Sequence, residues 1–153
     1  MHKQHLDGLL LDIPLEDNIE YYDHGAKTNL KQWLIGIYDQ YKTQKNDGLK
    51  HFSMFNSGVM TGPHKNNGKN LYFIAYKEKF GSKKRSAVAV LKTRAHEETH
   101  FLDHSGNLKY LLNDMLSNGD IQSCVKICIA YMCGQDEQIA HVGGSYAIRK
   151  RKM

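Results

Sequence analysis

The sequence has no apolar run close to the ~20 residues that a membrane-spanning helix needs. Residues 1–12 also lack the basic start and apolar core of a secretory signal. We therefore expect a cytoplasmic protein without a membrane partner, with signal-independent export as the alternative. With 2 prolines, 41% hydrophobic and 24% charged residues, the chain has the composition of a globular protein rather than a disordered one.

Cysteine is scarce, with 3 residues at positions 124, 128 and 133. An odd number without a paired framework fits a reducing compartment. Cys124 and Cys128 lie one helical turn apart and could join a metal site. They stand in the apolar segment 124–130, however, where small thiols are commonly buried. We therefore expect both in the core.

Strong charge of one sign is also missing, since the formal net charge is only +5. The basic residues concentrate at 83–85 and at 149–152. Such runs are usually solvated, so we expect a hairpin tip and a solubilising tail. A nucleic-acid partner is the least favoured, because the aromatic residues do not interleave with a basic stripe.

We interpret residues 1–27 as an irregular N-terminal arm or short strand that could cover a cleft, with Asp23 or His24 near the site. The 153 residues suit one domain, which we place at 28–153. Its first helix is predicted over 28–45, capped by Thr28 or Asn29. Apolar residues recur there at three- and four-residue steps; they are Leu30, Trp33, Leu34, Ile37, Tyr38 and Tyr41.

The middle of the chain has the pattern of strands. A turn is expected at 66–68, and residues 71–76 and 86–91 are predicted strands, joined as a hairpin by the polar segment 77–85. Beyond Thr93, a possible helix cap, further helices are expected, broken at 105–106, 118–119 and 134. This order of a helix, a small antiparallel or mixed sheet and further helices predicts an α+β fold.

The segment 94–100, Arg-Ala-His-Glu-Glu-Thr-His, contains the motif HExxH. Residues four apart project from one face of a helix, so His96 and His100 can reach a single ion. Zinc, at about 2.0–2.1 Å from each nitrogen, is the natural occupant of such a pair. Zinc lowers the pKa of a bound water to about 7, and Glu97 can take its proton. We predict one Zn²⁺ ion with Glu97 as general base.

A catalytic zinc normally has three protein ligands and an open position for water. The candidates for the third ligand are His104, Asp103, Asp136, Glu137 and His141. We favour Glu137, because its helix could pack antiparallel to the motif helix and present the carboxylate; His104 and Asp136 come next, and then His141. Structural roles compete with this, since histidine suits the end of a helix and acidic residues suit its first turn.

With these residues, the chain resembles the zincin metallopeptidases. Within them it resembles the gluzincins, and most nearly the minigluzincins and the ImmA/IrrE-type peptidases. The resemblance covers roughly residues 70–147 and rests on HExxH and on Glu137-Gln138-Ile139-Ala140. It implies a compact zincin-like fold, with His96, His100 and Glu137 as zinc ligands and Glu97 as general base. It also implies that the strand before the motif helix holds an extended peptide by edge pairing.

The sequence departs from the family pattern at several positions. Glu98 and Thr99 replace small or apolar residues inside the motif, which suggests a more exposed helix. The acidic residue that supports the ligand histidines after the third ligand is not evident, because position 141 is His. Asp103 could give this support instead, by accepting the imidazole N–H of a ligand histidine. Tyr146 could stabilise an oxyanion, although packing is the commoner role of such a tyrosine. The pair at 143–144, Gly-Gly, is expected to permit close backbone approach or a bend.

Two functions compete. The first is a zinc-dependent metallopeptidase that hydrolyses peptide bonds in a peptide or protein substrate. The second is a zincin-fold binding or regulatory module, or an effector, that keeps the metal without efficient turnover. The ligands and the general base would survive in both, so the residues alone do not separate them.

Overall fold

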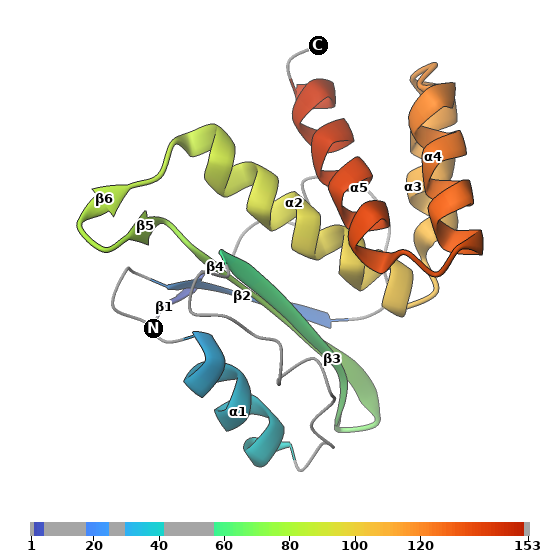
Figure 1. Cartoon of the computed structure of the whole chain (residues 1–153). Helices are drawn as coiled ribbons and strands as arrows, with labels where there is room; N and C mark the ends of the chain where they lie inside the picture. Colours follow the sequence, from blue (N-terminus) through green and yellow to red (C-terminus); the bar gives the residue numbers. More distant parts are fainter. Residues whose placement is uncertain (1, 5–17, 25–29, 42–56, 152–153) are drawn as a thin grey trace.

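The computed structural model describes residues 2–4, 18–24, 30–41 and 57–151, and the structural statements below concern these residues. The fold is α+β, as the sequence predicts, with a mixed sheet between one helix on one side and four on the other (Figure 1). The predicted caps Thr28 and Asn29 lie outside the described residues. None of the described helices has the length and apolar character needed to cross a bilayer.

The main sheet has the strand order β1-β2-β4-β3. Its strands are β1 (His2–Gln4), β2 (Asn18–His24), β3 (Gly58–Asn66) and β4 (Lys69–Lys77). β2 runs parallel to β4, whereas the other pairs are antiparallel. β1 and β2 come from the predicted N-terminal arm, and β2 lies inside the sheet. The arm's role over a cleft stays a prediction, because the side chains of Asp23 and His24 lie outside the described part.

The predicted turn at 66–68 joins β3 to β4. Asn67 and Gly68 have φ angles of 52° and 79°, and two consecutive positive φ values are what the tightest hairpin turns require. The strand predicted at 71–76 lies within β4. The hairpin therefore forms where the sequence placed its turn, and it leaves β3 at the edge of the sheet.

β4 is the buried centre of the fold because both of its faces are covered. Leu71 and Phe73 pack with Ile37 of α1 (Leu30–Gln40). The alternate residues of β4 face the larger core under the other helices; they are Tyr72, Ile74 and Tyr76. Adjacent strand residues point to opposite faces, so one apolar strand serves two helical layers.

The segment 86–91, predicted as a strand, is helical, and it forms the first turns of α2 (Ala87–His104). Ser86 caps this helix, since its hydroxyl oxygen accepts a hydrogen bond from the Ala89 N–H at 3.1 Å. Thr93, considered as the cap, lies inside the helix and donates to the Ala89 carbonyl at 3.0 Å. The alternation of alanine and valine resembles a strand, but alanine favours the helix that Ser86 begins.

The segment 77–85 does form a hairpin, but a smaller one than expected. Its strands are β5 (Lys79–Phe80) and β6 (Lys83–Lys84), which turn through Gly81 at a φ of 60°. The hairpin precedes α2 directly and, as Figure 1 shows, projects beyond the main sheet.

Three more helices follow α2, with breaks at the predicted positions. They are α3 (Leu108–Ser117), α4 (Ile121–Met132) and α5 (Asp136–Arg151). Two cations of the basic tail pair with this bundle instead of being free in solvent: Arg149 binds Asp120 at 3.0 Å and Lys150 binds Asp114 at 2.9 Å.

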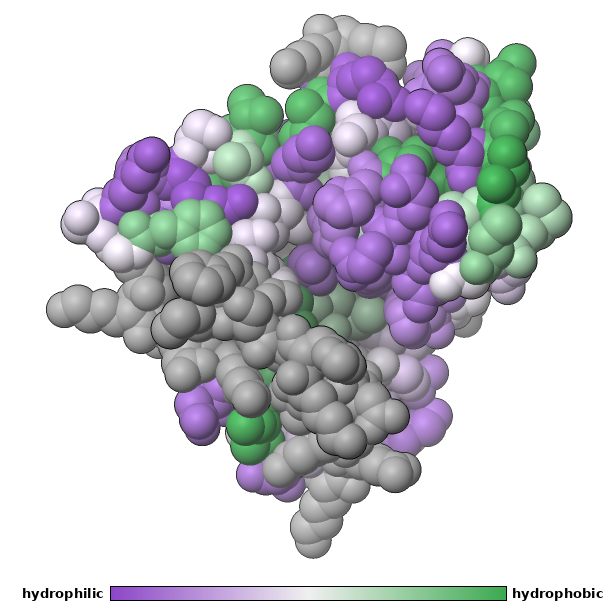
Figure 2. Space-filling model, in the orientation of Figure 1, coloured by the Kyte–Doolittle hydropathy of each residue, from purple (hydrophilic) through white to green (hydrophobic). Residues whose placement is uncertain are grey.

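The expectation that both Cys124 and Cys128 are buried is wrong for Cys128, which is exposed on α4, whereas Cys124 is half-buried. α4 packs inward through Ile127 and its neighbours, so residues one position further around the helix face solvent. Figure 2 shows hydrophobic residues gathered over this outer surface of α4. Helical position, and not side-chain hydrophobicity, decides burial here.

α5 packs closely on α2 through its two consecutive glycines, as the sequence led us to expect. A Cβ atom at Gly143 would lie 2.6 Å from Thr99 Cγ2, and one at Gly144 would lie 3.4 Å from the backbone nitrogen of His96. Ordinary helix pairs keep their axes about 8–10 Å apart because side chains separate them. The missing side chains allow α5 to lie directly against the motif.

We predict that Gly143→Ala lowers the free energy of unfolding by about 1–3 kcal/mol, because the added methyl group overpacks the contact with Thr99. Adding Thr99→Ala should restore part of that loss. Gly36→Ala in α1 is the control, because a Cβ there meets nothing within 4 Å, and alanine should stabilise that helix by up to ~1 kcal/mol. Urea unfolding measures all four proteins. Equal stability of Gly143→Ala and wild type would contradict the close-packing argument.

Candidate metal centre

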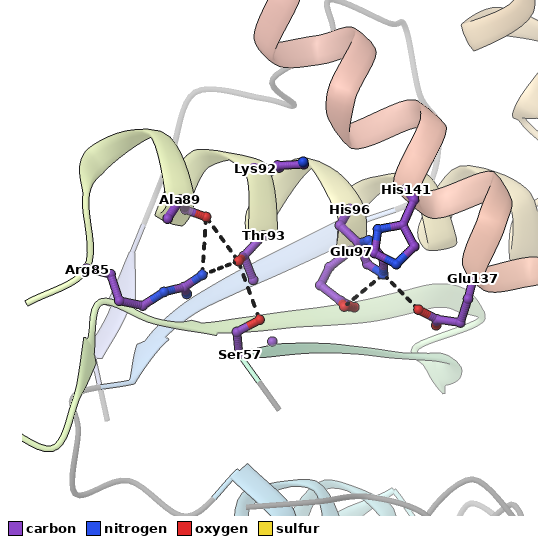
Figure 3. Close-up of a pocket in the computed structure, with 10 residues that line it drawn as sticks. Ser57, Arg85, Ala89, Lys92, Thr93, His96, Glu97, Glu137 and His141 are labelled. Carbon is purple, nitrogen blue, oxygen red and sulfur yellow. Dashed lines mark hydrogen bonds and ion pairs between the residues drawn. The ribbon is translucent and has the colours of Figure 1, made fainter. Parts of the chain in front are cut away.

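The two motif histidines lie on one face of α2 and point toward the start of α5. His96 Nε2 lies 3.1 Å from Glu137 Oε2, and His100 Nε2 lies 2.8 Å from Glu137 Oε1. One donor atom from each of these residues lies within 4.8 Å of the others. Figure 3 shows Glu137 reaching from α5 to His96. The structure therefore brings together the pair and the third residue that the sequence favoured.

Glu137 reaches this position because of where it stands in α5. It belongs to the first turn, where the partial positive charge of a helix N-terminus favours a carboxylate. The glycine contact of α5 with α2 lies further along the same helix, over Thr99 and His96. The close approach of the two helices thus places the first turn of α5 beside the imidazoles.

Burial favours the neutral form of both imidazoles. Burial, helped by the neighbouring His100, lowers the pKa of His96 to about 4, although Glu137 opposes the shift. Burial also lowers the pKa of His100. For Glu137, burial favours the neutral acid, but the charges and hydrogen bonds of His100 and His96 prevail and lower its pKa. Neutral imidazole nitrogens beside a carboxylate form a donor set for a divalent cation.

The donor set fits zinc in type. Two imidazole nitrogens and one carboxylate are a common ligand set of catalytic zinc sites. Tetrahedral coordination with bonds of about 2.0–2.1 Å puts ligand atoms roughly 3.3 Å apart. One donor atom from each of the three residues lies within 4.8 Å of the others, and the separations of 3.1 and 2.8 Å join the two Nε2 atoms to different oxygens of Glu137.

Glu97 lies beside the group without belonging to it. Its Oε1 is 4.0 Å from His96 Nε2, and the residue is only 7% exposed. Burial, together with the charge of Glu137, raises the pKa of Glu97 to about 8. A nearby cation would lower that value. A carboxyl group with a pKa near the working pH is suited to accept and return a proton.

β3 shapes the surroundings of Glu97. A Cβ atom at Gly58 would lie 2.7 Å from Thr93 Cγ2 and 3.2 Å from Glu97 Cγ. Glycine therefore allows the first residue of this edge strand to pack against the motif helix. The strand and the helix form two walls of a shared cavity.

The metal centre opens into a pocket of about 450 Å³. Figure 3 shows the residues around it, which come from the start of β3, the segment before α2, α2 itself and α5. They are Ser57, Gly58, Arg85, Ala89, Lys92, Thr93, His96, Glu97, Glu137 and His141. His141, the last-ranked ligand candidate, is exposed and holds its ring 4.6 Å from that of His96. A molecule bound in this pocket would touch His96, Glu97 and Glu137 together.

Three other candidate ligands form a group of their own. Asp103, His104 and Asp136 have donor atoms within 4.8 Å of one another, and this group shares no member with the first. His104 and Asp136, although both are neighbours of His100, do not join the donor group of the histidine pair. The support expected from Asp103 has no counterpart among the described residues, where no hydrogen bond joins it to His96 or His100. Burial raises the pKa of Asp103.

Tyr146 does not reach the pocket, so the oxyanion role considered for it is corrected to packing. The residue is 2% exposed, and its hydroxyl donates to Asp114 Oδ2 at 2.6 Å and accepts from Asn118 Nδ2 at 3.0 Å. It belongs to the helical core. The hydroxyl joins α5 to α3 and is occupied there.

The motif helix is also less exposed than the sequence suggested. Glu98 is 1% exposed and Thr99 is fully buried. Glu98 pairs with Arg94 at 2.7 Å, and Thr99 donates to the Ala95 carbonyl at 2.8 Å. Each polar side chain finds its partner one turn back along the helix. This local pairing allows polar residues to replace apolar ones in a buried motif.

The sequence analysis missed part of the pocket wall. Arg85, assigned to a solvated hairpin tip, is half-buried and forms hydrogen bonds to Lys77 and Thr93. Gly58 and Lys92 had no assigned role. The only signal in the sequence was the position of Arg85 directly before the cap of α2. Its place beside the histidines depends on the fold.

No protein-family model, curated protein or solved structure matches this chain.

We predict that the metal-free protein loses stability as the pH rises from about 6.5 to 8. Glu97, with a pKa of about 8 when folded and 4.5 when unfolded, keeps a proton in that window only in the folded state. The free energy of unfolding should therefore fall by up to about 1.4 kcal/mol per pH unit. Urea unfolding in the presence of a chelator measures this slope.

Glu97→Gln is the matched variant, and it should remove this part of the slope. His96 does not contribute, since its pKa changes between 6.5 unfolded and about 4 folded, below the window. If the slope is the same in wild type and in Glu97→Gln, the raised pKa is not a property of Glu97.

Proposed function

We propose that this protein is a zinc-dependent metallopeptidase. The observation that carries the proposal is the convergence of His96, His100 and Glu137 within 4.8 Å, with Glu97 in the same pocket as His96 and Glu137. The resemblance of the HExxH and Glu-x-x-Ala segments to the zincins supports it. The pocket supports it as well, since a substrate there would reach both the donor set and the proton acceptor.

In this proposal His96, His100 and Glu137 hold the ion. When bound, zinc supplies Lewis acidity, which polarises a carbonyl group and acidifies water. Glu97 accepts a proton at its carboxylate as water attacks the scissile carbonyl, and returns it to the leaving amine. Its position on the wall near His96, 4.0 Å from Nε2, fits a group that acts from the side of the ion.

The substrate would lie along β3. This strand is at the edge of the sheet, and its first residue, Gly58, lines the pocket. An extended peptide can add to a free sheet edge through backbone hydrogen bonds. β3 replaces the strand expected at 86–91 in this role, because that segment is helical. The arrangement would bring a peptide carbonyl toward the ion and Glu97.

We predict that the purified protein binds one zinc ion per chain and that His100→Ala and Glu137→Ala lose it. Each variant removes a ligand atom. Loss of a residue that only hydrogen-bonds to a ligand typically weakens metal affinity by ~10–100-fold, so we expect a larger loss of zinc affinity here. His104→Ala and Asp136→Asn are the matched controls and should keep zinc. Elemental analysis after dialysis measures metal content. Zinc retained in Glu137→Ala and lost in Asp136→Asn would reassign the third ligand.

We predict that Glu97→Gln keeps zinc and cleaves a peptide library at least ~100-fold more slowly than wild type, because the proton acceptor is lost. Mass spectrometry of the products measures the rates, beside metal content for both proteins. Unchanged cleavage in Glu97→Gln would rule out the proposed role. Zinc binding without any cleavage by wild type would favour the binding or regulatory module.

A further inference from the structure

One positive side chain in the pocket has no negative partner among the described residues. Arg85 Nη1 donates to the Lys77 carbonyl at 2.7 Å, and Nη2 donates to Thr93 Oγ1 at 2.6 Å and to the Ala89 carbonyl at 3.3 Å. All three acceptors are neutral. A guanidinium has five N–H donors, so these three bonds leave two for another acceptor.

The guanidinium is held in place and is not free in solvent. Besides the hydrogen bonds, it lies 5.0 Å from the centre of the Phe80 ring, a cation–π contact within the β5–β6 hairpin. Burial lowers the pKa of Arg85, and no opposite charge counters that shift. Partly buried charges are normally paired with an opposite charge. A fixed guanidinium with neutral partners is therefore suited to an anion from outside.

Arg85 lines the same pocket as His96 and Glu137 of the candidate metal centre. Its partner Thr93 is one helical turn before Glu97, a step of roughly 5.4 Å along α2. Lys92, exposed on the same helix, adds a second positive charge to the pocket wall. Figure 3 shows Arg85 and the pair His96 and Glu137 at opposite ends of the drawn group.

We propose that Arg85, assisted by Lys92, binds a carboxylate of the substrate at the end of the pocket opposite His96 and Glu137. This inference rests on the proposed peptidase function and adds a substrate class to it: peptides with an acidic side chain or a free C-terminal carboxylate at that position. Arginine suits this role because it stays charged, and each of its two remaining N–H groups can donate to a carboxylate oxygen.

Four pools of labelled peptides test the proposal. One pool contains Glu and Asp, and a second replaces them with Gln and Asn; each is made with a free carboxylate and with an amide at the C-terminus. Fluorescence anisotropy measures binding to the zinc-loaded Glu97→Gln protein and to the metal-free wild type, so that attraction to the ion is separated from attraction to Arg85. Cleavage by wild type is measured in parallel.

We expect about tenfold tighter binding of the carboxylate-bearing pools, as for a charged hydrogen bond. Arg85→Met should abolish the preference, whereas Arg85→Lys should keep most of it. Lys84→Met is the matched control, since it removes the same charge one residue away and outside the pocket, and it should change nothing. Preference that follows acidic side chains identifies that source, and preference that follows the free C-terminus identifies the other.

Equal binding of all pools by the protein with Arg85 intact would overturn the inference, even if Arg85→Met does not fold. A preference that persists in folded Arg85→Met would overturn it too. The proposed function fails separately: carboxylate preference without cleavage of any pool would leave the anion subsite standing and remove the peptidase. Cleavage of all pools without a preference for carboxylates would support the peptidase and remove the anion subsite.

Discussion

The candidate site depends on one contact, the close packing of α5 on α2 at Gly143 and Gly144. Side chains at these positions would meet Thr99 and the backbone of His96, and the helices would have to separate. Glu137 stands two turns before these glycines on the same rigid helix, so its distance from the imidazoles is set by that approach. Two residues without side chains thus control where a carboxylate meets the motif.

Burying the polar groups of the site costs free energy, and the fold offsets this cost to a different degree for each group. Glu98 and Arg94 neutralise each other within the motif helix, and Thr99 bonds to its own backbone. Glu97 has only a long contact of 4.0 Å with His96 among the described residues, and burial raises its pKa to about 8, which favours its neutral form. A bound cation would stabilise the charged form of such a buried carboxyl group. Metal binding and folding are coupled when binding stabilises the folded state in this way. The same residues that destabilise the metal-free site would stabilise the loaded one.

The pocket is assembled from segments that are distant in the chain. β3 and α2 form two walls, α5 supplies Glu137 and His141, and the connection from the β5–β6 hairpin supplies Arg85. Acidic groups and imidazoles gather around one end, and Arg85 occupies the other. If the proposed metal binds at one end, the fixed positive charge at the other would orient a substrate that carries a carboxylate. This polarity depends on Phe80 and on the cap of α2, which hold Arg85 against the helix.

The sequence by itself determined what local patterns control: the α+β order, the turn at 66–68, the breaks between helices and the spacing of His96 and His100. Each depends on residues within one or two turns of each other. The tertiary structure decided the rest. It made 86–91 helical, turned Cys128 outward and Tyr146 inward, and set Glu137 ahead of His104 beside the histidine pair. These outcomes depend on which helix faces meet, and contacts between faces distant in sequence leave no periodic signal in the chain.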